Sequence, residues 1–189
     1  MSDGAYLVDD PRNIGEPNGV ILPGVGEFSA CMNALESKGF RSVVLGLVED
    51  SVPVLGLCVG MQMLFDGSDE SPGSKGLGLL SGRVRRIRNA RRLPQMQWNR
   101  LDLVGDGGEL LRNLPEDPWV YFVHSYAVTT SRYATSTCNY GEDLVASVQV
   151  GALFGTQFHP EKSSGTGLTI LRNFVDFAEG RARETNPSH

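Results

Sequence analysis

Cys58 has the sequence surroundings of a reactive thiol. It ends an apolar extended run over residues 52–57, Gly56 and Gly60 flank it at two-residue offsets, and a helical pattern follows. Glycine on both sides relieves the crowding of a sharp strand-to-helix turn, which is the arrangement of a nucleophile elbow. Such a turn would expose the sulfur at a helix N-terminus, where the helix dipole favours the thiolate. The alternative interpretation is a buried structural cysteine.

An imidazole and a carboxylate follow a second extended pattern, over residues 154–158. His159 and Glu161 are two residues apart, so they point the same way on an extended chain, and Pro160 biases His159 toward that geometry. The carboxylate can orient the ring while the ring takes the proton of a thiol. Alone, the two residues would suggest a surface pair. Together with Cys58 they predict a catalytic triad.

The elements that position Cys58 alternate between strand and helix. Extended patterns cover residues 19–22 and 52–57, and the first is typical of a buried strand. Helical patterns follow each of them, the second continuing to Phe65, and another covers residues 40–50. Residues 1–18 are a loop-rich start with at most a short strand over 5–8. This alternation predicts an α/β fold in three layers, with a mostly parallel central sheet and flanking helices, of the flavodoxin-like kind.

The second half of the chain is richer in short strands. A loop with many glycines and serines covers residues 67–82, and a final helix carries Leu168, Phe174 and Ala178 on one face. The short strands between them are predicted over residues 83–87, 100–104, 119–124, 134–140, 144–148 and 154–158. Their close spacing suits a mixed or antiparallel extension of the sheet. We expect a single domain over residues 1–189, with a frayed tail over 181–189.

The bulk composition excludes several classes of protein. The formal charge of −5 argues against nucleic-acid binding, and no apolar stretch approaches the roughly 20 residues that cross a membrane. Three cysteines without a signal-peptide pattern predict no disulfide framework and a cytoplasmic location. No metal-ligand spacing occurs, so neither a metal nor another cofactor is expected. A basic cluster is interpreted as the solvated face of an edge strand, with a docking patch as the alternative; it comprises Arg83, Arg85, Arg86, Arg88, Arg91 and Arg92.

Cysteine, histidine and glutamate in this order on a strand–turn–helix scaffold resemble the class I (triad) glutamine amidotransferases. Further segments look like the family of glutaminase subunits of imidazole glycerol phosphate synthase; they are residues 23–26, 61–62, 68–71, 98–99, 121–126 and 157–163. The resemblance runs from about Gly19 to Phe177. It implies that Cys58 attacks the side-chain amide of L-glutamine, giving a glutamyl thioester and ammonia. His159 would move the proton and Glu161 would hold His159.

The resemblance also implies residues that assist this chemistry. The oxyanion of the intermediate needs fixed donors, which the backbone N–H groups of Val59 and Val25 would supply. Val25 lies in a glycine-rich turn with Gly24, over residues 23–26. We expect this turn to be a switch that aligns only when substrate and partner are bound. By position, the substrate-binding residues are Gln62, Glu70, Ser125 and Tyr126, the last two acting through their backbone.

The partner implied by the resemblance is a cyclase subunit with a (β/α)8 barrel. In a heterodimer, ammonia would pass through this barrel, which makes imidazole glycerol phosphate and AICAR in histidine biosynthesis. Trp98, Asn99 and Tyr121 match positions near the interface, although composition alone favours core packing for the two aromatic residues. Where the family usually has His and Gly, this chain has Gln95 and Gln97.

The chain begins near the second strand of the family pattern. In that pattern, roughly 35–40 residues of a strand–helix unit precede this point, and their loss would expose an edge of the sheet.

Three alternative functions stay open from the sequence. The first is a paralogous amidotransferase that feeds another synthetase, such as one acting on a nucleotide sugar. The others are a non-catalytic regulatory protein and a thiol hydrolase or peptidase of related fold.

Overall fold

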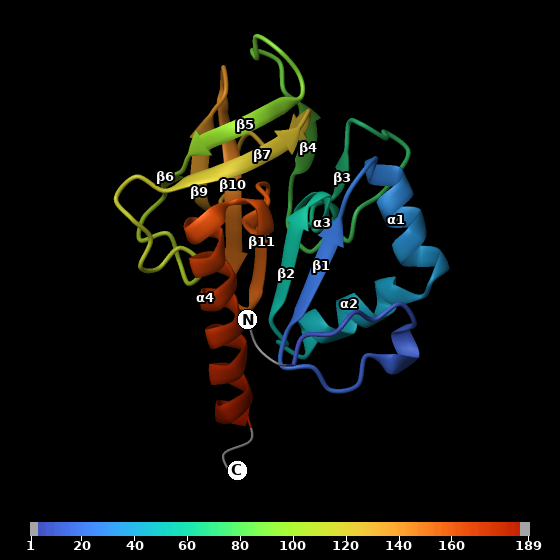
Figure 1. Ribbon diagram of the computed structural model, residues 1–189. Helices are drawn as coiled ribbons and strands as arrows, with labels where there is room; N and C mark the ends of the chain where they lie inside the picture. Colours follow the sequence, from blue (N-terminus) through green and yellow to red (C-terminus); the bar gives the residue numbers. More distant parts are fainter. Residues whose placement is uncertain (1–3, 186–189) are drawn as a thin grey trace.

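A six-stranded mixed sheet forms the centre of the computed structural model, which describes residues 4–185 (Figure 1). From edge to edge, its strands are β1 (Val20–Gly24), β2 (Val54–Cys58), β11 (Leu153–Thr156), β10 (Asp143–Val150), β9 (Ala134–Asn139) and β6 (Asp102–Leu103). The pairs from β1 to β11 are parallel, and those from β11 to β6 are antiparallel. The α/β class and the antiparallel extension are confirmed. The sheet is mixed rather than mostly parallel, because β9, β10 and β11 follow one another through connections too short for parallel crossovers.

Helices cover both faces of this sheet. Within residues 4–185 the α-helices are α1 (Phe28–Ser37), α2 (Phe40–Glu49), α3 (Val59–Met63) and α4 (Ser164–Thr185). Val54 of β2 packs in an apolar cluster with Met32 of α1, whereas Leu55 packs in a second cluster with Phe174 of α4. Because successive strand residues point to opposite faces, the two clusters lie on opposite sides of the sheet. Figure 1 shows α4 on one side and α1 and α2 on the other, so the three predicted layers are confirmed.

Two smaller β structures complete the fold. A three-stranded sheet contains β3 (Gly67–Ser68), β4 (Arg83–Arg86) and β8 (Tyr126–Ala127). Strand β5 (Gln95–Arg100) pairs antiparallel with β7 (Trp119–His124), and we call this pair the β5–β7 ribbon. The sequence patterns missed β3, β5 and β8. The strand predicted over 100–104 is divided, because the chain passes from β5 to β6 through the buried Leu101.

Helix α3 is shorter than predicted, ending at Met63 although the helical pattern continues to Phe65. The carbonyl groups of Met63 and Phe65 accept hydrogen bonds from the N–H groups of Leu77 and Gly78. Pairing with this later segment therefore replaces the next helical turn.

The edges and ends of the chain also differ from the expectations. Ile21 of β1 is 43% exposed, since β1 is an edge strand paired with β2; it is not the fully buried strand that the sequence predicts. The loop-rich start is confirmed from residue 4 onward, with no strand over 5–8 and one 3-10 turn, η1 (Pro11–Asn13). Helix α4 continues to Thr185, so the frayed tail is wrong for 181–185; residues 186–189 lie outside the described part.

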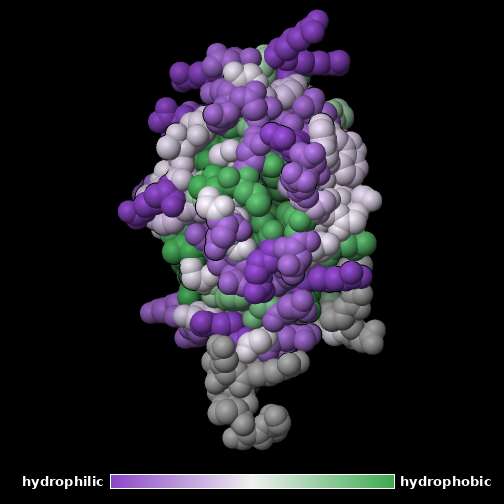
Figure 2. All heavy atoms as spheres, turned by 90° about the vertical axis from the view of Figure 1, so that its left-hand side faces the viewer, coloured by the Kyte–Doolittle hydropathy of each residue, from purple (hydrophilic) through white to green (hydrophobic). Residues whose placement is uncertain are grey.

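The opposite edge of the sheet is the short strand β6. Figure 2 looks onto the side of the molecule that lies at the left of Figure 1, where β6 is found, and shows hydrophobic atoms between hydrophilic side chains. Leu103 and Val104 at this edge are partly exposed.

In the basic cluster, Arg83 pairs with Asp69 and the other five arginines are exposed, as expected of a solvated face.

Candidate active site

Cys58 lies at a strained turn between β2 and α3. Its φ and ψ angles are 52° and −111°, in a region that non-glycine residues rarely adopt. A Cβ atom at Gly56 would lie 2.7 Å from the Gly60 carbonyl carbon, and one at Gly60 would lie 2.0 Å from the Leu22 oxygen. Neither position can therefore hold a side chain. The geometry of the predicted strand-to-helix elbow is confirmed, including the reason for its flanking glycines. The role of Cys58 as the nucleophile stays a prediction.

The state of the thiol differs from the prediction. Cys58 is only 5% exposed, so the expected exposed sulfur is wrong. Burial raises the pKa of the Cys58 thiol to about 11, although hydrogen bonds from the Val59 N–H and the Gln157 amide act in the opposite direction and lower it. Desolvation outweighs the N-terminus of a helix only five residues long. The prediction of a favoured thiolate is wrong for this state, and Cys58 needs a base to become a nucleophile.

His159 and Glu161 form the predicted pair. His159 Nδ1 lies 2.8 Å from Glu161 Oε1, so the ring donates from Nδ1 to the carboxylate and keeps Nε2 as its basic nitrogen. Nε2 is buried and has no hydrogen-bond partner among the described residues. Glu161 reaches the ring from the 3-10 turn η2 (Pro160–Lys162), not from the extended segment that the sequence predicts. The orientation of the ring by the carboxylate is confirmed.

The main chain around His159 is held from two sides. The His159 N–H donates to the Tyr121 oxygen at 2.9 Å, and the Ser163 hydroxyl donates to the His159 oxygen at 2.6 Å. The Tyr121 N–H in turn donates to Ser163 Oγ. Tyr121 of the β5–β7 ribbon therefore fixes the backbone of His159. Sequence patterns do not indicate this role, because it depends on main-chain atoms.

Cys58 and His159 lie at the same end of the sheet. In the parallel pair of β2 and β11, Leu57 lies opposite Thr156, so the residues that follow each strand share the carboxyl edge. Ligands of open α/β sheets bind at this edge. The sulfur accepts a hydrogen bond here from Gln157 Nε2, at 3.8 Å. The segment after β11 therefore brings an amide to the thiol and carries His159 to the same edge of the sheet. No hydrogen bond joins His159 Nε2 to the sulfur in this state.

Gln62 and Tyr126, two of the predicted substrate-binding residues, are joined to this centre through Gln157. Gln62 is 2% exposed, and its Nε2 donates to the Tyr126 oxygen at 2.9 Å and to Gln157 Oε1 at 3.0 Å. The Ser125 oxygen accepts from the Ile87 N–H. The carbonyl groups of residues 125 and 126 are therefore engaged within the protein.

Glu70 is not a solvated loop charge. Its Oε2 accepts a hydrogen bond from the Phe28 N–H at 2.9 Å, at the first residue of α1. A carboxylate is favourable at this position because it satisfies a free N–H group and complements the helix dipole. Glu70 thus connects its loop to the segment that directly follows residues 23–26.

The predicted oxyanion turn lies against the elbow. A Cβ atom at Gly24 would lie 2.5 Å from the Gly60 nitrogen, so the end of β1 touches the start of α3. The Val25 side chain is 78% exposed, and its carbonyl group accepts a hydrogen bond from the Cys31 thiol at 3.4 Å. The turn is close enough to serve the site, and its role as a donor stays a prediction.

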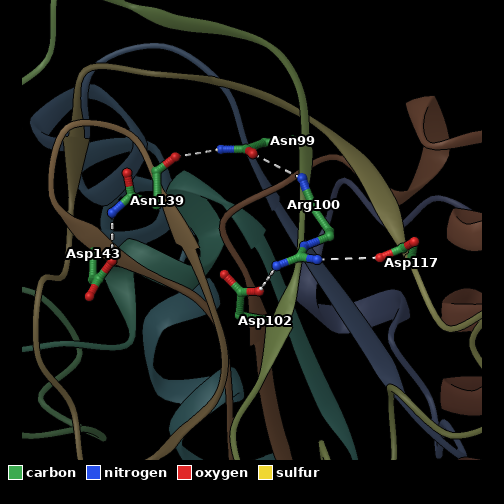
Figure 3. Close-up of polar contacts among 6 residues, drawn as sticks. All are labelled: Asn99, Arg100, Asp102, Asp117, Asn139 and Asp143. Atoms are coloured by element: carbon green, nitrogen blue, oxygen red, sulfur yellow. Dashed lines mark hydrogen bonds and ion pairs between the residues drawn. The ribbon is translucent and has the colours of Figure 1, made fainter.

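The predicted partner residues lie on the β5–β7 ribbon. Trp98 is 44% exposed and packs edge to face on Tyr121, with ring centroids 6.3 Å apart; core packing, which composition favours, is wrong for Trp98. Asn99 behaves differently (Figure 3). Its amide donates to the Asn139 oxygen and its Oδ1 accepts from the Arg100 N–H, so it ties β5 to β9. Arg100 pairs with Asp102 and Asp117 beside it.

The sequence reasoning missed the side chains of Gln157, Ser163 and His124. Gln157 and Ser163 belong to a segment that carried the family resemblance, which was the available signal for them.

Within residues 4–185, no group of three or more His, Cys, Asp or Glu side chains is placed to hold a metal ion, and no helix is long and apolar enough to cross a membrane.

Comparison with known proteins agrees with this geometry. The sequence model of the family "Glutamine amidotransferase class-I" matches residues 8–177. Relatives named imidazole glycerol phosphate synthase subunit HisH include one from Synechococcus sp. (strain JA-3-3Ab), 41% identical over 93% of this chain and 83% of its own length. Those from Deinococcus radiodurans and Methanothermobacter thermautotrophicus are 44% and 42% identical, covering 89% and 91% of this chain and 80% and 85% of their own lengths.

Solved structures share the fold at lower identity. A crystal structure of a glutamine amidotransferase matches with a TM-score of 0.71 and 22% identity, covering 93% of this chain and 86% of that one. Another glutamine amidotransferase, from Thermotoga maritima, matches with a TM-score of 0.57 and 21% identity, covering 90% of this chain and 69% of that one. At this identity the structures support the fold alone.

Proposed function

Since this chain belongs to the class I glutamine amidotransferase family, we propose that it is the glutaminase subunit of an imidazole glycerol phosphate synthase. The observation that carries the proposal is the strained elbow at Cys58 beside the hydrogen-bonded pair of His159 and Glu161. Relatives with that subunit name, at 41–44% identity, support the choice of synthase.

The reaction begins with a proton transfer that the resting site requires. Because burial keeps the Cys58 thiol protonated at neutral pH, its proton moves to His159 Nε2 as the sulfur attacks the amide carbon of glutamine. Glu161 stabilises the imidazolium that forms. The N–H groups of Val59 and Val25 would hold the oxyanion.

The intermediate then collapses with loss of ammonia. His159 returns the proton to the amide nitrogen, the C–N bond breaks, and a glutamyl thioester remains on Cys58. Water that is deprotonated by His159 attacks the thioester, which releases glutamate and restores the thiol. In this scheme Gln62 and Glu70 hold the substrate, together with the backbone of Ser125 and Tyr126.

The partner would be a cyclase subunit with a (β/α)8 barrel, bound at the ribbon surface around Trp98 and Tyr121. The backbone contact from Tyr121 to His159 supports a route by which binding there reaches the active site. Ammonia would pass to the barrel without entering bulk water. We place this heterodimer in the cytoplasm, where free thiols such as Cys31, Cys58 and Cys138 persist.

The test is glutamate formation by the purified chain, alone and with a cyclase barrel from the organism of one of the relatives. We expect turnover when the barrel and its nucleotide ligand are present, and none with Cys58→Ala. Turnover that a nucleotide-sugar synthetase stimulates and the barrel does not would contradict the choice of synthase. Absence of turnover with every partner would contradict the glutaminase assignment itself.

A further inference from the structure

The side chain of Gln157 lies between the nucleophile and a second buried amide. Its Nε2 is 3.8 Å from Cys58 Sγ, and its Oε1 is 3.0 Å from Gln62 Nε2. Gln157 is fully buried, and Gln62 nearly so. A primary amide in such a place must satisfy both of its ends, and here the sulfur of the reacting thiol is one of its partners.

The direction of these hydrogen bonds is fixed from outside the site. The Tyr126 main-chain oxygen can only accept, so Gln62 must turn its NH₂ group toward it. The same Nε2 donates to Gln157, which must therefore turn its Oε1 toward Gln62 and its NH₂ group toward the sulfur. Reversing the Gln157 amide would oppose two donors and place an oxygen lone pair against Cys58.

The carbonyl group that sets this direction is itself firmly held. Tyr126 begins β8, which pairs with β4, and its oxygen also lies 2.9 Å from His124 Nδ1. His124 is buried, so its ring cannot turn toward solvent to satisfy Nδ1 there. The hydrogen bonds therefore run from a fixed strand end through two amides to the thiol.

From this geometry we propose that Gln157 donates a hydrogen bond to the Cys58 thiolate as it forms, and that Gln62 and the Tyr126 carbonyl group are positioning residues for that donor. This rests on the proposed function, because it assigns Gln157 a role in the same reaction. A hydrogen bond to an ionised acceptor is about twice as strong as one between neutral groups, so the contact stabilises the thiolate more than the thiol. A preorganised donor of this kind lowers the barrier to proton transfer from Cys58 to His159.

The experiment compares Gln157→Met and Gln157→Glu with the unchanged chain. Both replacements have nearly the length of glutamine and lack the donor to sulfur. Alkylation of Cys58 by iodoacetamide is followed from about pH 7 to pH 10 and read on the Cys58 peptide by mass spectrometry. We expect the rate at about pH 8 to fall about tenfold in Gln157→Met, which is the value of one pKa unit, and further in Gln157→Glu, which places a carboxylate beside the sulfur.

Gln62→Leu tests the positioning step. It leaves Gln157 in place and removes the group that fixes its direction, so we expect a smaller fall, of about threefold, since a freed amide still donates part of the time. Thr156→Val is the matched control. Thr156 is also buried and hydrogen-bonded, to the Phe158 oxygen, and has no bond to Cys58, so the rate should stay within about twofold of the unchanged chain.

The ultraviolet absorbance of the Cys58 thiolate is measured as the difference from the matching Cys58→Ala protein. It shows whether a change in alkylation rate comes from ionisation of the thiol or from access of the reagent. Folded Gln157 variants with unchanged thiolate absorbance would overturn the proposal, as would an equal shift in Thr156→Val. In the complex with the barrel, we expect Gln157→Met to lower kcat and leave KM nearly unchanged. If the unchanged chain forms no glutamate, the glutaminase proposal fails, while the alkylation and absorbance data still decide the role of Gln157.

Discussion

Acidification should weaken this fold through one side chain, His124. Burial lowers the pKa of His124 to about 4 from an ordinary value of 6.5, with a smaller opposing effect from its hydrogen bond to Tyr126. In the unfolded chain His124 therefore binds a proton near pH 6.5, whereas in the folded protein it binds one only near pH 4. The stability that His124 contributes is complete above pH 6.5 and is lost as the pH falls to about 4. The two pKa values differ by about 2.5, and each unit corresponds to about 1.4 kcal/mol, so the full loss of stability is about 3.5 kcal/mol.

The assay is urea unfolding followed by tryptophan fluorescence at about pH 7 and pH 4.5, for the unchanged chain and for His124→Asn. Asparagine keeps a donor near the position of Nδ1 and does not titrate. Carboxylates such as Glu27, whose pKa is lowered by hydrogen bonds from Ser71 and Ser29, weaken both proteins equally in acid. Between these two pH values we expect the unchanged chain to lose about 2 kcal/mol more than the variant. Equal losses would refute the assignment of a buried neutral imidazole.

The other predictions concern the nucleophile, the elbow and the partner surface. Cys58→Ala should abolish glutamate formation and leave binding to the barrel intact in a pull-down assay; residual turnover would exclude Cys58 as the nucleophile. Gly60→Ala should lower the free energy of unfolding by more than about 2 kcal/mol, because its Cβ would lie 2.0 Å from the Leu22 oxygen. Gly46 lies inside α2 with open space around it, so Gly46→Ala should instead raise the free energy of unfolding by up to about 1 kcal/mol in a urea titration. Similar effects of the two substitutions would contradict the close packing of the elbow. Trp98→Ala should raise the Kd for the barrel at least tenfold by calorimetry while Leu103→Ala does not; an unchanged Kd would remove the ribbon from the interface.

Local rules predicted the parts of the site that depend on the backbone of one segment. The glycines around Cys58 predicted the elbow because a strained turn excludes neighbouring side chains, and this needs no knowledge of the rest of the fold. Periodicity placed α1, α2 and β7, since each has an apolar pattern of its own. It failed for β5, where the apolar Met96 and Trp98 are exposed and the polar Gln95 is buried, so pairing with β7 rather than an apolar pattern defines the strand.

The environment of each functional group was decided by tertiary structure. The sequence placed Cys58 at a helix N-terminus and so predicted a favoured thiolate, but desolvation by the packed strands raises its pKa to about 11. It likewise assigned Gln62 to the substrate, whereas the fold also uses its amide to direct Gln157 toward the sulfur.

The sequence by itself therefore determined the elbow that holds Cys58 and the family to which the chain belongs, and it predicted which residues carry the chemistry. Only the tertiary structure decided how far the thiol is desolvated, which amide faces it and how the ribbon is joined to His159. The physical reason is that burial and hydrogen-bond direction depend on groups far apart in the chain, whereas turns and side-chain periodicity depend on neighbours.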